Sequence, residues 1–249
     1  MAEDYKIVYP VMSHSVIAIV GGFGSGKTEV AVNMGKYLVA SQSLAVTLAD
    51  LDLVNPYFRS REAQKELENL GIKVIAPKDG QFYADLPILL PEIKGAIKHP
   101  GGTLILDVGG DAQGTRALGS LSDEFDPEDY DMFMVLNSRR PQTSDVAGSV
   151  ATMKRIEQKA RLKFTGLVSN THMLDDTDLE IVREGYRMAR EVGRQTGLPV
   201  VFVSMNEALL AGGEPGLEGS PVLPLSRSML KPWETGAKPT DRRGEIPKE

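Results

Sequence analysis

A glycine-rich octapeptide directly follows a short apolar run and limits how this chain can fold. Residues Val16–Val20 are apolar at every position, and residues 21–28 read Gly-Gly-Phe-Gly-Ser-Gly-Lys-Thr. Glycines at 21, 22, 24 and 26 leave the neighbouring backbone N–H groups unshielded, because they carry no Cβ. Apolar side chains then recur at helical spacing over residues 29–40. We therefore expect a strand, a tight loop and a helix, in that order.

The octapeptide matches the pattern G-x-x-x-x-G-K-[ST] in the context that this pattern needs, with a strand before it and a helix after it. Such a loop cradles phosphate groups, and the positive end of the helix points at them. Lys27 is expected to contact the β and γ phosphates, and the Thr28 hydroxyl to ligate Mg²⁺. The residues predicted to bind the nucleotide here are Gly21, Gly22, Gly24, Ser25, Gly26, Lys27, Thr28 and Glu29.

Apolar runs alternate with helical patterns along the rest of the chain. Several runs are apolar at consecutive positions, which is typical of parallel strands covered on both faces. We expect an α/β fold: a doubly wound, mostly parallel sheet with helices on both faces, the P-loop nucleotide triphosphatase fold. The expected strands are 16–20, 44–48, 72–75, 103–106, 132–136, 167–168 with the residues just before them, and 200–203; the expected helices are 29–40, 60–70 with Gly71 as C-cap, 146–160 and 178–195.

Two stretches are less regular. Residues 78–100 contain Pro87, Pro91 and Pro100 and are expected to form a broken helical insertion. Residues 226–249 are rich in proline, glycine and charge, so we expect a tail that is mostly disordered or draped over the surface. The predicted organisation is a nucleotide-binding domain over residues 1–225, followed by a flexible tail over 226–249.

Charge and composition exclude several classes of function. The formal net charge is −6, and the short basic clusters, Arg139–Arg140 among them, are interpreted as solvated faces, so no nucleic-acid surface is expected. The chain has no cysteine, which excludes disulfides, cysteine zinc sites and cysteine-ligated clusters within it. No apolar run is long enough to span a membrane, and the N-terminus does not read as a signal peptide. We expect a cytoplasmic protein without a membrane anchor.

Acidic residues follow two of the expected strands. Asp50-Leu51-Asp52 follows the second, and Asp107-Val108-Gly109-Gly110-Asp111 follows a later one. Asp107 is predicted to hold a Mg²⁺-bound water, and Asp52 or Asp111 to orient the attacking water. The Gly110 N–H is predicted to sense the γ-phosphate. The expected catalytic residues are Lys27, Asp52, Asp107 and Asp111, and the expected metal ligands are Thr28, Asp52 and Asp107.

The order of these motifs resembles the Min/Par/nitrogenase-reductase group of P-loop ATPases, often grouped with cobyrinic-acid synthases, over roughly residues 15–210. The resemblance implies that Asn170, in Val168-Ser169-Asn170, reads the adenine. It also implies that Asp50-Leu51-Asp52 followed by Val54-Asn55-Pro56 forms the first switch segment, and that residues 143–145 open the helix after the fifth strand. The group has a lysine where this chain has Gly22, and that lysine reaches across a dimer. Arg59 or Arg61 is a candidate substitute.

The residues favour ATP over GTP, because Asn170-Thr171-His172-Met173 lacks the aspartate with which guanine readers end this segment. The resemblance implies a Mg-dependent ATPase that acts as a nucleotide switch on an unknown protein partner, with residues 55–62 as its contact surface. A nucleotide-dependent homodimer is compatible with this interpretation. One alternative is an ATP-dependent synthase that activates a small carboxylate, as dethiobiotin- and cobyrinate-type enzymes do; another is a binding module with little turnover.

Overall fold

The computed structural model describes residues 7–52, 61–76, 82–212 and 214–228. Within them, eight parallel strands form one sheet in the order β3-β2-β4-β1-β5-β6-β7-β8. The strands are β1 Val16–Gly21, β2 Val46–Leu51, β3 Ile72–Ile75, β4 Thr103–Gly109, β5 Asp131–Leu136, β6 Gly166–Ser169, β7 Val200–Asn206 and β8 Val222–Leu225. The predicted α/β class is confirmed.

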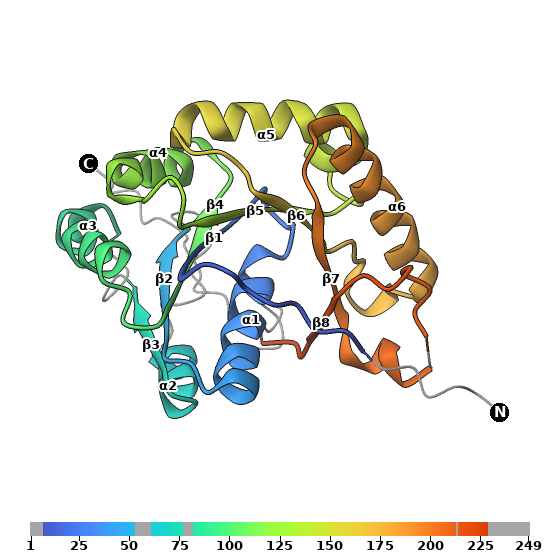
Figure 1. The fold of residues 1–249 in the computed structure, drawn as a ribbon, viewed down its shortest axis with the longest axis horizontal. Coiled ribbons are helices and arrows are strands. Elements are labelled where there is room, and N and C mark those ends of the chain that lie inside the picture. The colour runs from blue at the N-terminus through green and yellow to red at the C-terminus, as the bar shows by residue number, and fades with distance from the viewer. Residues whose placement is uncertain (1–6, 53–60, 77–81, 213, 229–249) are drawn as a thin grey trace, which may run out of the picture.

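Helices cover both faces of this sheet (Figure 1). They are α1 Lys27–Gln42, α2 Arg61–Asn69, α3 Phe82–Lys98, α4 Ala112–Leu121, α5 Val146–Ala160 and α6 Leu179–Thr196. Alternate residues of β1 divide between the two faces, since Ala18 packs in the same core cluster as residues of α3, α4, α5 and α6, whereas Ile17 and Ile19 pack with α1 and α2. Both faces are therefore dry, which explains why the strand is apolar at every position.

The helix termini follow the rules that the sequence suggested. Gly71 follows α2 with a positive φ of 84°, as expected of a C-cap. Asp145 and Asp178 cap the N-termini of α5 and α6 by accepting the backbone N–H groups of Gly148 and Ile181 at 2.7 and 2.8 Å. These caps fix where the two longest expected helices begin.

The interpretation of residues 78–100 as a broken helical insertion is wrong. α3 is one helix from Phe82 to Lys98 and it continues through Pro91. Ile93 and Ile97 are buried against the sheet. We infer that this packing offsets the backbone hydrogen bond that a proline cannot make.

Two elements were not predicted. The first is β8, which pairs with β7 alone and contains Pro224, a residue that an edge strand tolerates. The second is α4, whose two interior glycines lower its helix propensity. A Cβ on Gly114 would lie 2.4 Å from the carbonyl oxygen of Gly109, and a Cβ on Gly119 would lie 2.4 Å from that of Lys159. Glycine is needed at both places because α4 packs backbone to backbone on the end of β4 and on α5.

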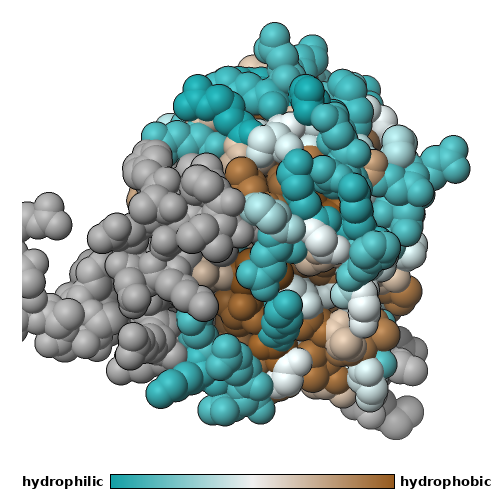
Figure 2. Space-filling model, turned by 90° about the vertical axis from the view of Figure 1, so that its left-hand side faces the viewer, coloured by the Kyte–Doolittle hydropathy of each residue, from teal (hydrophilic) through white to brown (hydrophobic). Residues whose placement is uncertain are grey.

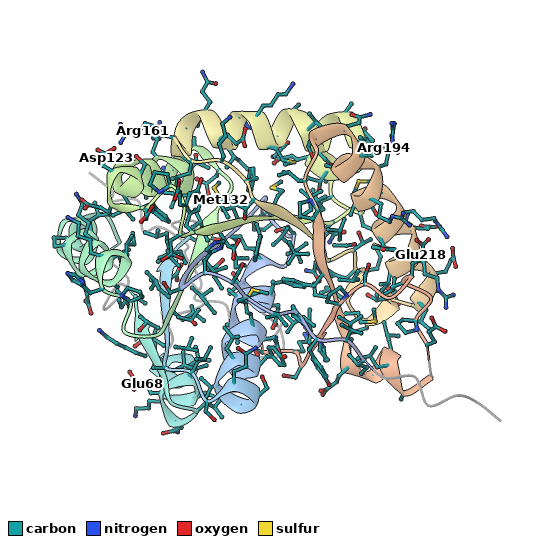
Figure 3. The ribbon with its side chains drawn as sticks, in the orientation of Figure 1. Glu68, Asp123, Met132, Arg161, Arg194 and Glu218 are labelled. Atoms are coloured by element: carbon teal, nitrogen blue, oxygen red, sulfur yellow. The ribbon has the colours of Figure 1, made fainter. Side chains whose placement is uncertain are left out.

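Many charged residues lie at the periphery. Figure 3 shows the buried Met132 in the middle of the molecule, with Glu68, Arg194 and Glu218 at its outer edge. The exposed arginines of α6 lie beside carboxylates, as in the pair Arg187–Glu180 at 2.7 Å. Seen from the side of α3 and β3, the described surface is largely hydrophilic, with hydrophobic residues visible between the polar ones (Figure 2). No described helix is both long and apolar enough to cross a membrane.

Candidate functional site

The glycine loop joins β1 to α1 at the carboxyl edge of the sheet. Because all the strands are parallel, the loops that follow β1, β2, β4, β5 and β6 lie at this same edge. The strand order also reverses beside β1, since the chain builds β2 and β3 on one side of it and then β5 to β8 on the other. Ligands of doubly wound sheets bind at such a reversal.

The loop backbone is held in a conformation that only glycine adopts readily. Gly24 and Gly26 have φ values of 73° and 83°, and the Ser25 N–H donates to the Gly22 carbonyl at 3.0 Å. A Cβ on Gly21 would lie 2.3 Å from the Ser25 hydroxyl oxygen. Gly26 is the N-cap of α1 and supplies no side-chain cap. The first turn of α1 therefore offers backbone N–H groups to an anion.

Lys27 lies among three carboxylates. Its ammonium group forms a buried ion pair with Asp52, and both side chains are almost fully shielded from solvent. Burial alone would lower the pKa of Lys27, but the charges of Asp107, Asp52 and Asp50 outweigh burial and raise it. Lys27 is therefore positively charged at the base of the loop.

Thr28 and Asp107 are joined directly. The Thr28 hydroxyl donates a 2.7 Å hydrogen bond to Oδ2 of Asp107, and both residues are buried. Burial raises the pKa of Asp107 to about 6, although the charge of Lys27 and the Thr28 hydrogen bond oppose that shift. Within the described part of the chain, the buried Oδ1 of Asp107 and the hydroxyl of Ser25 have no hydrogen-bond partner. A bound ligand or an ordered water would satisfy buried polar atoms of this kind.

These residues fit a magnesium–nucleotide complex. Thr28 and Asp107 are the hydroxyl and carboxylate that such a site uses, and Mg²⁺ completes its shell with phosphate oxygens and water. Among the described residues, no three histidine, aspartate or glutamate side chains converge to hold a metal by themselves. The predicted third ligand, Asp52, is held by Lys27.

Asp50 belongs to this cluster, although the sequence singled out only its neighbour Asp52. Asp50 is opposite Asp107 in the β2–β4 ladder and accepts the Asp52 N–H at 2.8 Å. Burial and the nearby charge of Asp107 raise its pKa well above the ordinary value. β2 extends to Leu51, three residues beyond the expected end, so both Asp50 and Asp52 are buried.

The segment after β4 contacts the glycine loop. The Gly110 N–H donates to the Gly21 carbonyl at 2.9 Å, and a Cβ on Gly110 would lie 2.8 Å from that oxygen. Asp111 caps α4, because its Oδ1 accepts the Gln113 and Gly114 N–H groups at 2.6 and 3.1 Å. A Cβ on Gly109 would lie 2.7 Å from the other oxygen of Asp111 and 3.2 Å from Asp52 Oδ1. The structure thus brings the carboxylates of Asp52 and Asp111 to the same face of Gly109.

Asn170 lies against the loop, at the end of β6. Its amide Nδ2 donates to the Ser25 carbonyl at 2.8 Å, and its Oδ1 accepts the Ser204 hydroxyl at 2.9 Å. A Cβ on Gly26 would lie 2.2 Å from Nδ2. Asn170 therefore holds the loop in place, and its contact with a base stays a prediction.

The Glu29 carboxylate contacts the start of the predicted tail. It accepts the Ser228 N–H at 3.0 and 3.1 Å, while Asn33 bonds to Ser226. The start of the predicted tail, residues 226–228, is thus tied to α1. Residues 229–249 lie outside the described residues, as do residues 53–60 with Arg59, and the side chain of Arg61 is not described.

The connection between β5 and α5 contributes residues that sequence reasoning missed. The Arg140 Nε donates to the Gly24 carbonyl at 2.8 Å, and a Cβ on Gly22 would lie 3.2 Å from the Gln142 side-chain oxygen. The interpretation of Arg139–Arg140 as a solvated face is wrong for Arg140, which is half-buried, and holds for the exposed Arg139. Two adjacent arginines give no signal of this difference in a sequence.

Comparisons with solved structures place the fold. The cell division protein FtsY of Thermotoga maritima matches with a TM-score of 0.52 and 20% identity, over 81% of this chain and 65% of that chain. The chloroplast FtsY of Physcomitrella patens matches with a TM-score of 0.55 and 18% identity, over 82% and 62%. The signal recognition particle 54 kDa protein of Aeropyrum pernix, in complex with GDP, matches with a TM-score of 0.54 and 18% identity, over 81% and 44%.

This chain spans less than two thirds of the length of those three proteins. No protein-family model and no curated protein sequence matches it. The three structures are FtsY and signal recognition particle proteins, whereas the sequence motifs resemble the Min/Par group. What the structures share with this chain is the α/β fold of P-loop nucleotide triphosphatases.

Proposed function

We propose that this protein is a Mg-dependent nucleoside triphosphatase that works as a nucleotide switch on a protein partner. The observation that carries the proposal is the pair Thr28–Asp107 beside the uncapped start of α1. This pair leaves one buried carboxylate oxygen of Asp107 without a partner among the described residues. A bound magnesium complex would give this carboxylate oxygen a partner.

Each residue has a role that its surroundings support. The loop N–H groups and Lys27 bind phosphate oxygens, and Thr28 ligates Mg²⁺, which neutralises charge as it develops on the phosphates. Asp107 accepts a hydrogen bond from a metal-bound water. Asp52 or Asp111 orients the attacking water, since both carboxylates lie at the same face of Gly109. The Gly110 N–H can bind a γ-phosphate only after it leaves the Gly21 carbonyl, which is the kind of change that a switch requires.

ATP is the nucleotide that we propose. The position where a guanine reader would carry an aspartate is Met173, and the nearby Asp175 is ion-paired with Arg227 at 3.4 Å. The second candidate is GTP, which the fold match to a GDP-bound signal recognition particle protein favours. Titration with ATP and GTP in parallel separates the two.

The remaining parts of the proposal rest on the sequence. We propose residues 1–225 as the nucleotide-binding domain and residues 226–249 as its tail. We also propose a relationship to the Min/Par group and residues 55–62 as the partner surface. The carboxylate-activating synthase remains the alternative. Turnover that occurs only when a small carboxylate is added would favour the synthase, and self-association that depends on nucleotide would favour the switch.

The decisive experiment compares two lysines of α1. Lys27→Ala should abolish or greatly weaken binding of Mg-ATP and Mg-GTP, measured by calorimetry, and should abolish phosphate release. Lys36→Ala is the control, because Lys36 lies on the same helix but pairs with Glu66 at 3.3 Å. Wild-type affinity in the Lys27 variant, or no nucleotide binding by the wild type, would overturn the proposed function.

A further inference from the structure

Arg140 lies flat against the glycine loop. Besides its 2.8 Å hydrogen bond to the Gly24 carbonyl, its Nε and Cζ atoms would lie 2.8 and 3.4 Å from a Cβ on Gly24. The absence of a side chain at position 24 therefore makes room for the guanidinium group. A contact this close brings a permanent positive charge to the middle of the loop.

The backbone holds Arg140 in this place. Its N–H donates to the Asn137 carbonyl at 3.1 Å, and its own carbonyl accepts the Thr143 N–H at 3.0 Å. The Thr143 hydroxyl closes the turn by donating to the Asn137 carbonyl at 2.8 Å. Asn137 also reaches the Gly24 carbonyl through its Nδ2 at 3.4 Å. The turn therefore positions the arginine before any ligand arrives, which lowers the entropy cost of binding.

The outer nitrogens of Arg140 remain available. Among the described residues, neither Nη atom has a hydrogen bond or an ion pair; only Nε is used, by Gly24. His172 also lies beside the loop, with its Nε2 3.2 Å from the position that a Cβ on Gly26 would take. Burial and the charge of Arg140 lower the pKa of His172 to about 4, so that imidazole is neutral near pH 7. The positive charge on this side of the loop therefore belongs to Arg140.

The charges beneath the loop favour a further cation beside it. Lys27 is surrounded by the buried carboxylates of Asp50, Asp52 and Asp107, and it is already paired with Asp52. A triphosphate adds several negative charges to this cluster. The ammonium group of Lys27 and one Mg²⁺ have to balance both the ligand and the buried carboxylates, so an arginine next to the loop is favourable.

We propose that Arg140 binds phosphate oxygens of the nucleotide through its two Nη groups, as a cation supplied by the same chain. The inference rests on the proposed function, because it assumes that a phosphate ligand occupies the loop. Arg140 would then supply, from the same chain, the positive charge that the Min/Par group supplies with a lysine at the position of Gly22. A side chain at Gly22 would meet Gln142, so the β5–α5 connection already fills that side of the loop.

The test compares Arg140→Gln with Arg139→Gln. Arg139 is the adjacent residue, is exposed and pairs with Glu184, so it carries the same substitution without the loop contact. The probes are Mg-ATP and Mg-tripolyphosphate, which shares the phosphate chain but has no base. Arg140→Gln should weaken both by about tenfold or more, and Arg139→Gln by less than about twofold.

Salt dependence separates a phosphate contact from a loop-positioning contact. The affinity lost in Arg140→Gln should shrink at high salt, because salt screens an ionic interaction. Arg140→Lys keeps the charge and should retain most of the salt dependence, though with weaker binding because lysine lacks the forked guanidinium. A loss of equal size at low and high salt would mean that Arg140 only holds the Gly24 carbonyl, which contradicts the inference.

Chemical modification of the wild-type protein tests the inference without a variant. Phenylglyoxal modification, mapped by peptide mass spectrometry, should be suppressed at Arg140 by Mg-tripolyphosphate while Arg139 stays reactive. If the wild type binds neither probe, the proposed function and the inference both fail. If it binds them and Arg140 is neither protected nor sensitive to substitution, the inference alone fails.

Discussion

Thr28 and Asp107 lie 79 positions apart in the chain, and the hydroxyl of the first donates a 2.7 Å hydrogen bond to the carboxylate of the second. Thr28 lies in the first turn of α1, and Asp107 lies in β4, the strand paired with β1. Sheet topology thus assembles the hydroxyl–carboxylate pair on which a magnesium site at this loop depends.

Removing that hydroxyl should reduce turnover more than nucleotide binding. Thr28→Val keeps the shape of the side chain but removes the predicted metal ligand, so Mg²⁺-dependent phosphate release should fall by about 10- to 100-fold. Thr28→Ser keeps the hydroxyl and is the matched control, with turnover close to that of the wild type. Equal turnover in the valine and serine variants, followed across a Mg²⁺ titration, would contradict the metal role.

The raised pKa of Asp107 predicts that stability falls as pH rises. Its pKa is about 6 in the folded protein against 3.8 ordinarily, so between these values the folded state holds a proton that the unfolded state has lost. The free energy of unfolding should therefore decrease from pH 3.8 to about 6, by about 3 kcal/mol at most from this group. The raised pKa of Asp50 acts in the same direction. Urea unfolding of the wild type and Asp107→Asn over this range measures the effect.

Asp107→Asn should lose less stability across that range, because its side chain does not ionise. The same ionisation should govern activity, since Asp107 must be charged to serve Mg²⁺. Turnover at limiting Mg²⁺ should therefore fall as the pH decreases through about 6. Parallel stability curves for the wild type and the asparagine variant would show that Asp107 does not titrate there.

Asn170 should prove to be a loop-positioning residue. Asn170→Ala removes the hydrogen bonds that Asn170 makes with the buried Ser25 carbonyl and the Ser204 hydroxyl, which should cost about 1–3 kcal/mol of unfolding free energy. Binding of Mg-ATP and of Mg-tripolyphosphate should weaken by the same factor, because the loop serves both. If ATP binding alone weakened, Asn170 would be a base-reading residue, as the sequence resemblance implies. Ser204→Ala should give a smaller effect of the same kind.

Glu29 should matter for stability and not for nucleotide binding. Its carboxylate accepts the Ser228 N–H, so Glu29→Ala should lower the free energy of unfolding by about 1 kcal/mol. Cleavage after residue 225 by a protease should become faster, because residues 226–228 lose their contact with α1. The Kd for Mg-ATP should be unchanged. A higher Kd would indicate that Glu29 contributes to nucleotide binding, as the sequence predicts.

The sequence predicted those parts of the fold that have a periodic apolar pattern or match a known motif. Several of the strands are continuous apolar runs, and the loop conformation follows from glycines at 24 and 26. The predicted end of β2 was early because apolar patterning cannot identify a buried carboxylate. Lys27 pairs with Asp52, and the Asp52 N–H donates to Asp50, which helps to offset the burial of both carboxylates. That compensation is tertiary, so no local pattern records it.

Other parts depend on contacts between distant segments. α4 has poor intrinsic propensity, and its glycines reflect backbone packing on Gly109 and Lys159. Arg140 and Asn170 reach the loop from the ends of β5 and β6, more than a hundred residues later in the chain. Asn170 was selected because of a motif, but its hydrogen bond to Ser25 was not anticipated. Arg140 had no motif and was missed.

The close packing of α4 determines how a change at the loop would spread. At Gly114 and Gly119 there is no side chain between this helix and its neighbours that could rotate to absorb a shift. Asp111 also fastens the first turn of α4 to the segment that touches Gly21. A rearrangement at Gly110 would therefore displace α4 as a rigid body and carry α5 with it. The outer surface of these two helices would then report, far from the phosphates, which ligand the loop holds.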